Sequence, residues 1–187
     1  MRIVRGILFG FAFSAVLVLR STASAYYPLY PPTVTGTKWL SGQPACDASG
    51  NWVAPFVVEG TYSWISRSDN NGTTWATAKL ISTPNNYPGR CETDGNGTWL
   101  VPVMSQDATL GAGPLDTVYV MRSTDAGATW SGPTFLSPIP GGGVYSHVGP
   151  EVAADKAGNW VGAWSTFEAL GTPGAYASVS VARSSVL

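Results

Sequence analysis

The stretch "MRSTDAGATWS", from Met121 to Ser131, decides the fold because the chain repeats it. An earlier copy reads "WISRSDNNGTTW" and ends at Trp75, and a third begins as "SVARSSVL" in the last eight residues. The Arg-Ser pairs within the copies are 55 and 61 residues apart. Recurrence at such a period indicates an architecture of stacked, similar units.

A second phrase precedes the first in every unit. It reads "CDASGNWVAPF" from Cys46, "ETDGNGTWLVPV" from Glu92 and "AADKAGNWVGAW" from Ala153. Each copy contains an aspartate, a glycine-bearing turn, a tryptophan and an apolar run, and the tryptophans are 47 and 61 residues apart. Two phrases that keep the same order along the chain support a repeated unit more strongly than either phrase alone.

Each unit is predicted to form a blade of four antiparallel strands, a to d, in an all-β propeller, because a period of about 50 residues is typical of such blades. Runs such as "TVYVM" are apolar on both faces, as strands packed between two sheets are. The expected strands are 43–47, 52–58, 62–68 and 75–82 in the first unit, 90–93, 99–104, 117–123 and 130–136 in the second, and 150–154, 160–165 and 178–184 in the third.

The segment 35–42, "TGTKWLSG", is similar to 76–83, "ATAKLIST", and is therefore predicted to be a lone strand d. The strand order is then d, abcd, abcd, abc, which amounts to three blades. A strand d at the start is able to complete strands abc at the end, but closed rings have about four to eight blades.

The stretch "STDAGATW" resembles the Asp-box, the bacterial neuraminidase repeat, with every signature position filled. The earlier copy is similar but has asparagine where the aspartate belongs. The resemblance covers about residues 33–187 and implies half of a six-bladed sialidase-like propeller, in which each box forms the turn from strand c to strand d at the outer rim. The signature residues are Ser68, Asn70, Gly72, Thr74 and Trp75 in the first copy, and Ser123, Asp125, Gly127, Thr129 and Trp130 in the second.

The first 25 residues are organised like a signal peptide. Arg2 and Arg5 precede the apolar run 6–19, and Ala23-Ser24-Ala25 forms an A-x-A cleavage site. A buried N-terminal helix is the alternative interpretation. We therefore expect a secreted, periplasmic or cell-surface protein whose mature propeller segment, 26–187, has no membrane span.

Composition excludes other classes of partner. Removal of the signal takes away three of the ten basic residues and leaves seven against eleven acidic ones, a net charge of −4. A nucleic-acid partner is therefore not expected, because it requires a basic surface. The single histidine and the absence of a C-x-x-C motif give no basis for a metal site, and no cofactor is expected.

Sialidase chemistry, as the resemblance describes it, uses three arginines to bind the substrate carboxylate, a tyrosine–glutamate pair and an acid/base aspartate. The arginines Arg67, Arg122 and Arg183 share one repeat position and are expected at the rim, where they cannot converge. No catalytic role is therefore assigned, and the remaining candidates near the axis are Arg90, Glu92, Tyr145 and Glu151.

The other polar residues have structural interpretations. Glu92 and Glu151 are also expected as solvated channel carboxylates, and His147 as a surface loop residue. The recurring aspartates 47, 94 and 155 are expected to cap the turn before strand b. Cys46 and Cys91 lie at strand a of successive blades, so an exported chain is predicted to be able to join them in a disulfide.

The sequence thus predicts a sialidase-like propeller that binds glycans or another extracellular ligand without a complete hydrolase site. One alternative is an exo-alpha-sialidase, of which this chain is a fragment or a subunit. Another is a structural or interaction propeller at the cell surface. The incomplete ring predicts either a longer propeller or two chains that associate into one six-bladed ring.

Overall fold

The computed structural model describes residues 38–39, 42–58, 62–81, 86–106, 116–137, 145–168 and 177–184. The predicted signal peptide lies outside these ranges. Within them the regular structure is entirely β, as predicted, and forms three antiparallel sheets. No helix in this part of the chain is long and apolar enough to cross a membrane.

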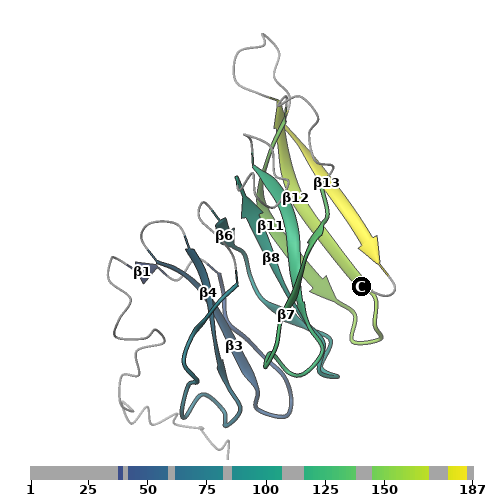
Figure 1. The fold of residues 1–187 in the computed structure, drawn as a ribbon. Helices are drawn as coiled ribbons and strands as arrows, with labels where there is room; N and C mark the ends of the chain where they lie inside the picture. The colour runs from purple at the N-terminus through teal and green to yellow at the C-terminus, as the bar shows by residue number, and fades with distance from the viewer. Residues whose placement is uncertain are drawn as a thin grey trace, which may run out of the picture.

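The sheets follow one another along the chain as three blades. Blade 1 contains β1 (Lys38–Trp39), β2 (Ala45–Cys46), β3 (Trp52–Val58), β4 (Tyr62–Ser68) and β5 (Lys79–Leu80). Blade 2 contains β6 (Asn86–Pro88), β7 (Glu92–Thr93), β8 (Trp99–Ser105), β9 (Thr117–Ser123) and β10 (Ser131–Phe135). Blade 3 contains β11 (Tyr145–Ala154), β12 (Trp160–Glu168) and β13 (Ala177–Ser184). Figure 1 shows the three sheets standing side by side in this order.

The central strands of each blade were the most predictable. The ranges 52–58, 62–68 and 117–123 are confirmed to the residue as β3, β4 and β9. The residues of β3 and β9 are buried almost throughout, whereas three residues of β4 are half-buried or exposed. The strands predicted at the blade edges are confirmed in place but differ in length, as β5 and β11 do.

The innermost strand of blades 1 and 2 consists of two halves. β1 and β2 pair with opposite ends of β3, and β6 and β7 pair with opposite ends of β8. The lone strand d predicted at 35–42 is therefore wrong, because Lys38 and Trp39 pair with Val58 and Val57 as the first half of strand a. A short alternating segment is compatible with pairing to more than one neighbouring strand. Its similarity to 76–83 therefore led to the wrong strand assignment.

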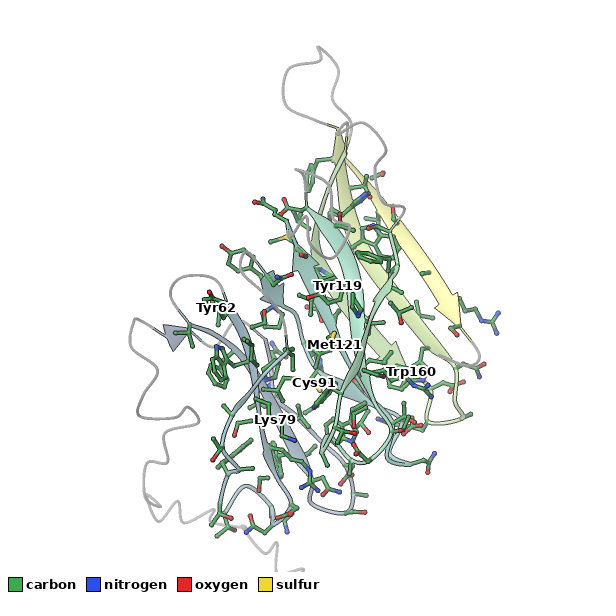
Figure 2. All side chains as sticks on the ribbon, in the orientation of Figure 1. Tyr62, Lys79, Cys91, Tyr119, Met121 and Trp160 are labelled. Atoms are coloured by element: carbon green, nitrogen blue, oxygen red, sulfur yellow. The ribbon has the colours of Figure 1, made fainter. Side chains whose placement is uncertain are left out.

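Blades 1 and 2 share the main hydrophobic core. Val53 and Ile65 of blade 1 meet Cys91, Trp99 and Tyr119 of blade 2, all at most 3% exposed. Figure 2 shows Cys91, Tyr119 and Met121 in this layer between the sheets. Stacked blades bury both faces of their central strands, which explains the continuous apolar runs in the sequence.

Blades 2 and 3 share a smaller core. It contains Leu100 and Val120 of blade 2 and Val152 and Trp160 of blade 3, with Leu136 packed against them. The other face of β12 and β13 is exposed and partly apolar: Val179 is 75% and Val181 63% exposed.

Candidate functional site

The backbones of the innermost strands of the three blades approach one another closely at Gly42, Gly89 and Pro150. A Cβ atom on Gly42 would overlap the carbonyl oxygen of Gly89, and one on Gly89 would overlap the carbonyl oxygen of Pro150. The Cys91 backbone N–H donates to the Gln43 carbonyl oxygen at 3.2 Å across the same gap. Glycine is needed where two backbones approach this closely.

In each blade, one exposed residue directly follows this position of close approach. Gln43 follows Gly42, Arg90 follows Gly89, and Glu151 follows Pro150. Each lies four residues before the aspartate that begins the next turn, so the three positions are equivalent in the repeat. We call Gln43, Arg90 and Glu151 the inner row; it presents an amide, a cation and a carboxylate on neighbouring strands.

Glu92 lies between two cations from different blades. Its carboxylate oxygens are 3.9 Å from an Arg90 guanidinium nitrogen and 3.1 Å from Lys156 Nζ. Lys156, in the turn between β11 and β12, also donates to the Thr93 carbonyl oxygen at 2.5 Å. Glu92 is therefore engaged in joining blade 2 to blade 3, whereas half of the Arg90 side chain remains exposed.

The remaining candidates lie on β11. Glu151 pairs in register with Ala163 and is exposed, and the backbone of Tyr145 pairs with Glu168. The Tyr145 side chain lies outside the described part of the structure. The candidates thus come from two adjacent inner strands, with Arg90 and Glu92 in ionic contact.

His147 is not the surface loop residue predicted from the sequence, because β11 begins two residues before it. The residue is 6% exposed, its backbone N–H donates to the Asp116 carbonyl oxygen at 3.0 Å, and Nδ1 lies 3.1 Å from Thr166 Oγ1. Burial lowers the pKa of His147, and the charge of Asp116 opposes that shift. A neutral, packed histidine follows from this environment.

The rim arginines do not converge with Arg90. Arg67 donates from Nε to the Ala126 carbonyl oxygen of blade 2 at 2.7 Å and from a terminal nitrogen to Asn51 Oδ1 at 3.2 Å. Its guanidinium therefore fastens one blade to the next. Arg122, its equivalent in blade 2, is half-buried, and Arg183 is exposed near the end of β13.

The box sequences form the turns from β4 to β5 and from β9 to β10, which we call the first and second box turns, 68–75 and 123–130. In the second, Ser123 Oγ accepts from the Gly127 N–H at 2.9 Å, and Asp125 Oδ1 accepts from the Thr129 N–H at 2.8 Å. Trp130 Nε1 donates to the Gly127 carbonyl oxygen at 3.1 Å.

The first box turn repeats this arrangement with asparagine. Ser68 Oγ accepts from the Gly72 N–H at 3.0 Å, and Asn70 Oδ1 accepts from the Thr74 N–H at 2.9 Å. Asn70 therefore supplies the acceptor that the turn needs. The polar side chains of both turns are occupied by backbone groups, which is a structural role.

Asp125 should make stability depend on acid pH. The Thr129 hydroxyl and backbone N–H lower its pKa to about 2 from 3.8. A lowered folded-state pKa means that the carboxylate contributes stability above pH about 4, and that this is lost as the pH falls through 2. We expect Asp125→Asn to be less stable than the wild type near neutral pH, with the difference in urea midpoint shrinking between pH 4 and 2.

Asn70→Asp is the matched control, because it should create the same acid dependence in the first box turn. Carboxyl NMR titration of the wild-type protein measures the pKa directly. An Asp125 carboxyl that titrates near 4 would contradict the prediction.

The recurring aspartates hold the turns before β3, β8 and β12, as the sequence indicated. Asp47 Oδ1 accepts from the Ser49 and Asn51 N–H groups at 2.9 and 3.0 Å. Asp94 and Asp155 accept from the equivalent N–H groups, two and four residues later. These carboxylates are therefore committed to the backbone.

The two cysteines are free thiols, which corrects the predicted disulfide. Counted from the aspartates, Cys91 is equivalent to Pro44 and Cys46 to Thr93, so the two are offset along neighbouring strands. Cys91 is fully buried in the core, whereas Cys46 is exposed. Burial, and next the charge of Glu92, raise the pKa of the Cys91 thiol well above its usual value.

Thiol titration should separate the two cysteines. In the folded, unreduced protein we expect one thiol per chain to react rapidly with Ellman's reagent, and a second to react only in denaturant. Cys46→Ser should remove the fast phase and leave the slow one. Failure to detect any thiol after unfolding would mean that the two are joined.

Two cavities lie between blades, away from the inner row. One of about 120 Å³ is bounded by Ile65, Arg67 and Lys79 of blade 1 and by Ala128 and Trp130 of the second box turn. The other, of about 60 Å³, lies between blades 2 and 3, against Leu100, Val120 and Trp160. Neither contains the paired carboxylates that glycoside hydrolysis commonly uses.

Sequence reasoning missed Gln43 and Lys156. Alignment of the three units on their aspartates would have placed Gln43 beside Arg90 and Glu151, because all three precede the aspartate by four residues. No comparable signal marks Lys156, whose contact with Glu92 joins residues 64 positions apart.

No model of a known protein family matches the chain, and no curated protein matches it either. Among solved structures, it is similar to an alpha-L-arabinanase from Penicillium chrysogenum in complex with arabinobiose, at 14% identity and a TM-score of 0.49, covering 72% of this chain and 40% of that one. It is also similar to an alpha-L-arabinofuranosidase from Fusarium graminearum in complex with an iminosugar inhibitor, at 12% identity and a TM-score of 0.48, covering 72% and 41%. The chain thus spans about two fifths of either structure.

Proposed function

We propose that this chain is a secreted, sialidase-like Asp-box propeller segment that binds a glycan or another extracellular ligand at the inner row, without a complete hydrolase site. The observation that carries the proposal is the exposed Arg90 between Gln43 and Glu151, at the level where three inner strands meet. Amide, guanidinium and carboxylate groups are suited to the hydroxyl and carboxylate groups of sugars.

The arrangement of the arginines favours binding over hydrolysis. Arg67 is bonded to the second box turn, and Arg122 and Arg183 hold the equivalent rim positions. Arg90 is thus the arginine available at the inner row of the described blades, and one guanidinium does not make a three-arginine clamp for a carboxylate.

A glycan array probed with the mature protein tests the proposal. We expect binding to at least one class of acidic or neutral glycan, and a loss of affinity of about tenfold for Arg90→Ala, because a charge-assisted hydrogen bond is removed. Arg183→Ala, which removes an exposed rim arginine, is the matched control and should bind as the wild type does. An array without binding would support the structural alternative instead.

A fluorogenic sialoside tests the alternative that the chain is a hydrolase. We expect no release of 4-methylumbelliferone from its sialoside by the chain alone. Turnover that Arg90→Ala abolishes would overturn the binding-only proposal and support the exo-alpha-sialidase alternative.

A further inference from the structure

Asparagine is followed by glycine at two places in the chain, and the structure describes both. Asn71-Gly72 lies in the first box turn, and Asn96-Gly97 lies in the turn between β7 and β8. Both asparagines are exposed, and a threonine follows the glycine in each copy. Asparagine is chemically labile before glycine, because glycine has no side chain to hinder attack by its backbone nitrogen on the asparagine side chain. The two copies therefore differ mainly in their folded surroundings.

The first copy is restrained at both reacting groups. The Gly72 N–H donates to Ser68 Oγ at 3.0 Å. The Asn71 backbone N–H donates to the Gly50 carbonyl oxygen at 2.9 Å. The Asn71 side chain also packs against Gly50, where an added Cβ atom would lie 2.6 Å from Asn71 Oδ1. The nitrogen that has to attack is thus hydrogen-bonded, and the side chain that it has to reach is packed against a neighbouring turn.

The second copy leaves the attacking nitrogen free. Asp94 Oδ1 accepts from the Asn96 N–H at 2.8 Å and from the Thr98 N–H at 3.0 Å. Gly97 lies between these two donors, and its own N–H has no hydrogen-bond partner in the described part of the chain. The Gly97 carbonyl oxygen accepts from the Ala126 N–H at 3.1 Å. The turn is therefore fixed on either side of a nitrogen that nothing described restrains.

We propose that Asn96 is a site of deamidation, and that the first box turn protects Asn71 from the same reaction. The Gly97 nitrogen gives its proton to water or hydroxide and bonds to Asn96 Cγ, while the Cγ–Nδ2 bond breaks and ammonia leaves. Water then opens the cyclic imide. Opening at Cγ gives aspartate, and opening at the backbone carbonyl carbon of residue 96 gives isoaspartate. One water is consumed for each ammonia released.

The isoaspartate product changes the backbone of blade 2. It routes the chain through the side chain of residue 96 and so adds a carbon atom before Gly97. The turn then has to give up either its bonds to Asp94 or the bond between Gly97 and Ala126, which connects it to the second box turn. Modified protein should accordingly have a lower urea midpoint than fresh protein, and Asn96→Gln should keep its midpoint over the same time.

Incubation of the full chain at mildly alkaline pH, followed by trypsin digestion and mass spectrometry, tests the assignment. Cleavage after lysine and arginine places Asn71 in the peptide 68–79 and Asn96 in the peptide 91–122. We expect Asn96 to be converted about fivefold faster than Asn71 or more, because the bond from Gly72 to Ser68 has to open first. Equal rates, faster conversion of Asn71, or an unmodified Asn96 would overturn the proposal.

Unfolding and one pair of variants show whether the fold causes the difference. In guanidinium chloride the two rates should converge, and a difference that persists there would contradict protection by the box turn. Ser68→Ala removes the acceptor of the Gly72 N–H and should bring the rate at Asn71 close to that at Asn96. Ser123→Ala removes the equivalent acceptor in the second box turn and is the matched control, which should leave Asn71 protected. An unchanged rate at Asn71 in Ser68→Ala would also count against the proposal.

Discussion

Replacement of Trp99 with alanine is expected to lower the free energy of unfolding by about 4 kcal/mol, the largest effect of any single substitution considered for this chain. Trp99 is fully buried in the core between blades 1 and 2. Its removal leaves a cavity that Val53 and Ile65, held on rigid strands, cannot fill. Urea denaturation measures the change as a lower midpoint at constant slope.

The repeat supplies the control for this substitution. Trp52 has the same position in blade 1 but is only half-buried, so Trp52→Ala should cost clearly less. Trp99→Phe should also cost less than the alanine variant, because it keeps a ring and removes an indole N–H that has no partner among the described residues. Equal destabilisation by all three variants would mean that Trp99 is not a packing residue.

Replacement of Gly89 with alanine is expected to lower the free energy of unfolding by about 3 kcal/mol, because the added methyl group has no space. It would overlap the Pro150 carbonyl oxygen and lie 3.1 Å from Pro102 Cγ. Backbone cannot yield as a side chain does, so the inner strands of blades 2 and 3 must separate. Thermal and urea denaturation measure the effect.

Gly162→Ala is the matched control for Gly89→Ala. Its added methyl group meets Leu136 Cδ1 at 2.9 Å, the end of a flexible side chain, so the cost should stay below about 1 kcal/mol. The separation of the strands in Gly89→Ala should also move Arg90, which makes the proposed glycan binding a second measure. A Gly89→Ala protein as stable as Gly162→Ala would show that the inner strands are not held at this level.

The strands that sequence predicted best are the central strands β3, β4 and β9. The residues of β3 and β9 form almost unbroken apolar runs that are buried nearly throughout, whereas β4 mixes buried residues with half-buried and exposed ones. The aspartate turns were equally legible, because Asp47 and Asp125 bond to backbone groups within four residues. Hydrogen bonds between residues this close in the chain can be predicted from the sequence alone.

The features that could not be predicted from the sequence depend on the pairing of strands that lie far apart in the chain. Lys38 and Trp39 alternate like any short edge strand, and only the register with β3 shows that they belong to strand a. His147 was predicted as a surface loop residue, but pairing with β12 brings it into a strand. The free state of Cys46 and Cys91 depends on an offset between strands that single repeats do not reveal.

The bond from Arg67 to the Ala126 carbonyl oxygen has a consequence for how such a chain grows. The donor belongs to one blade and the acceptor to the turn of the next, and both come from the same repeated phrase. Duplication of one unit would therefore duplicate the arginine donor and the carbonyl acceptor together with the sheet that they connect to its neighbour. An array of such units is able to lengthen by whole blades, because each added unit already contains the groups that bond to its neighbour.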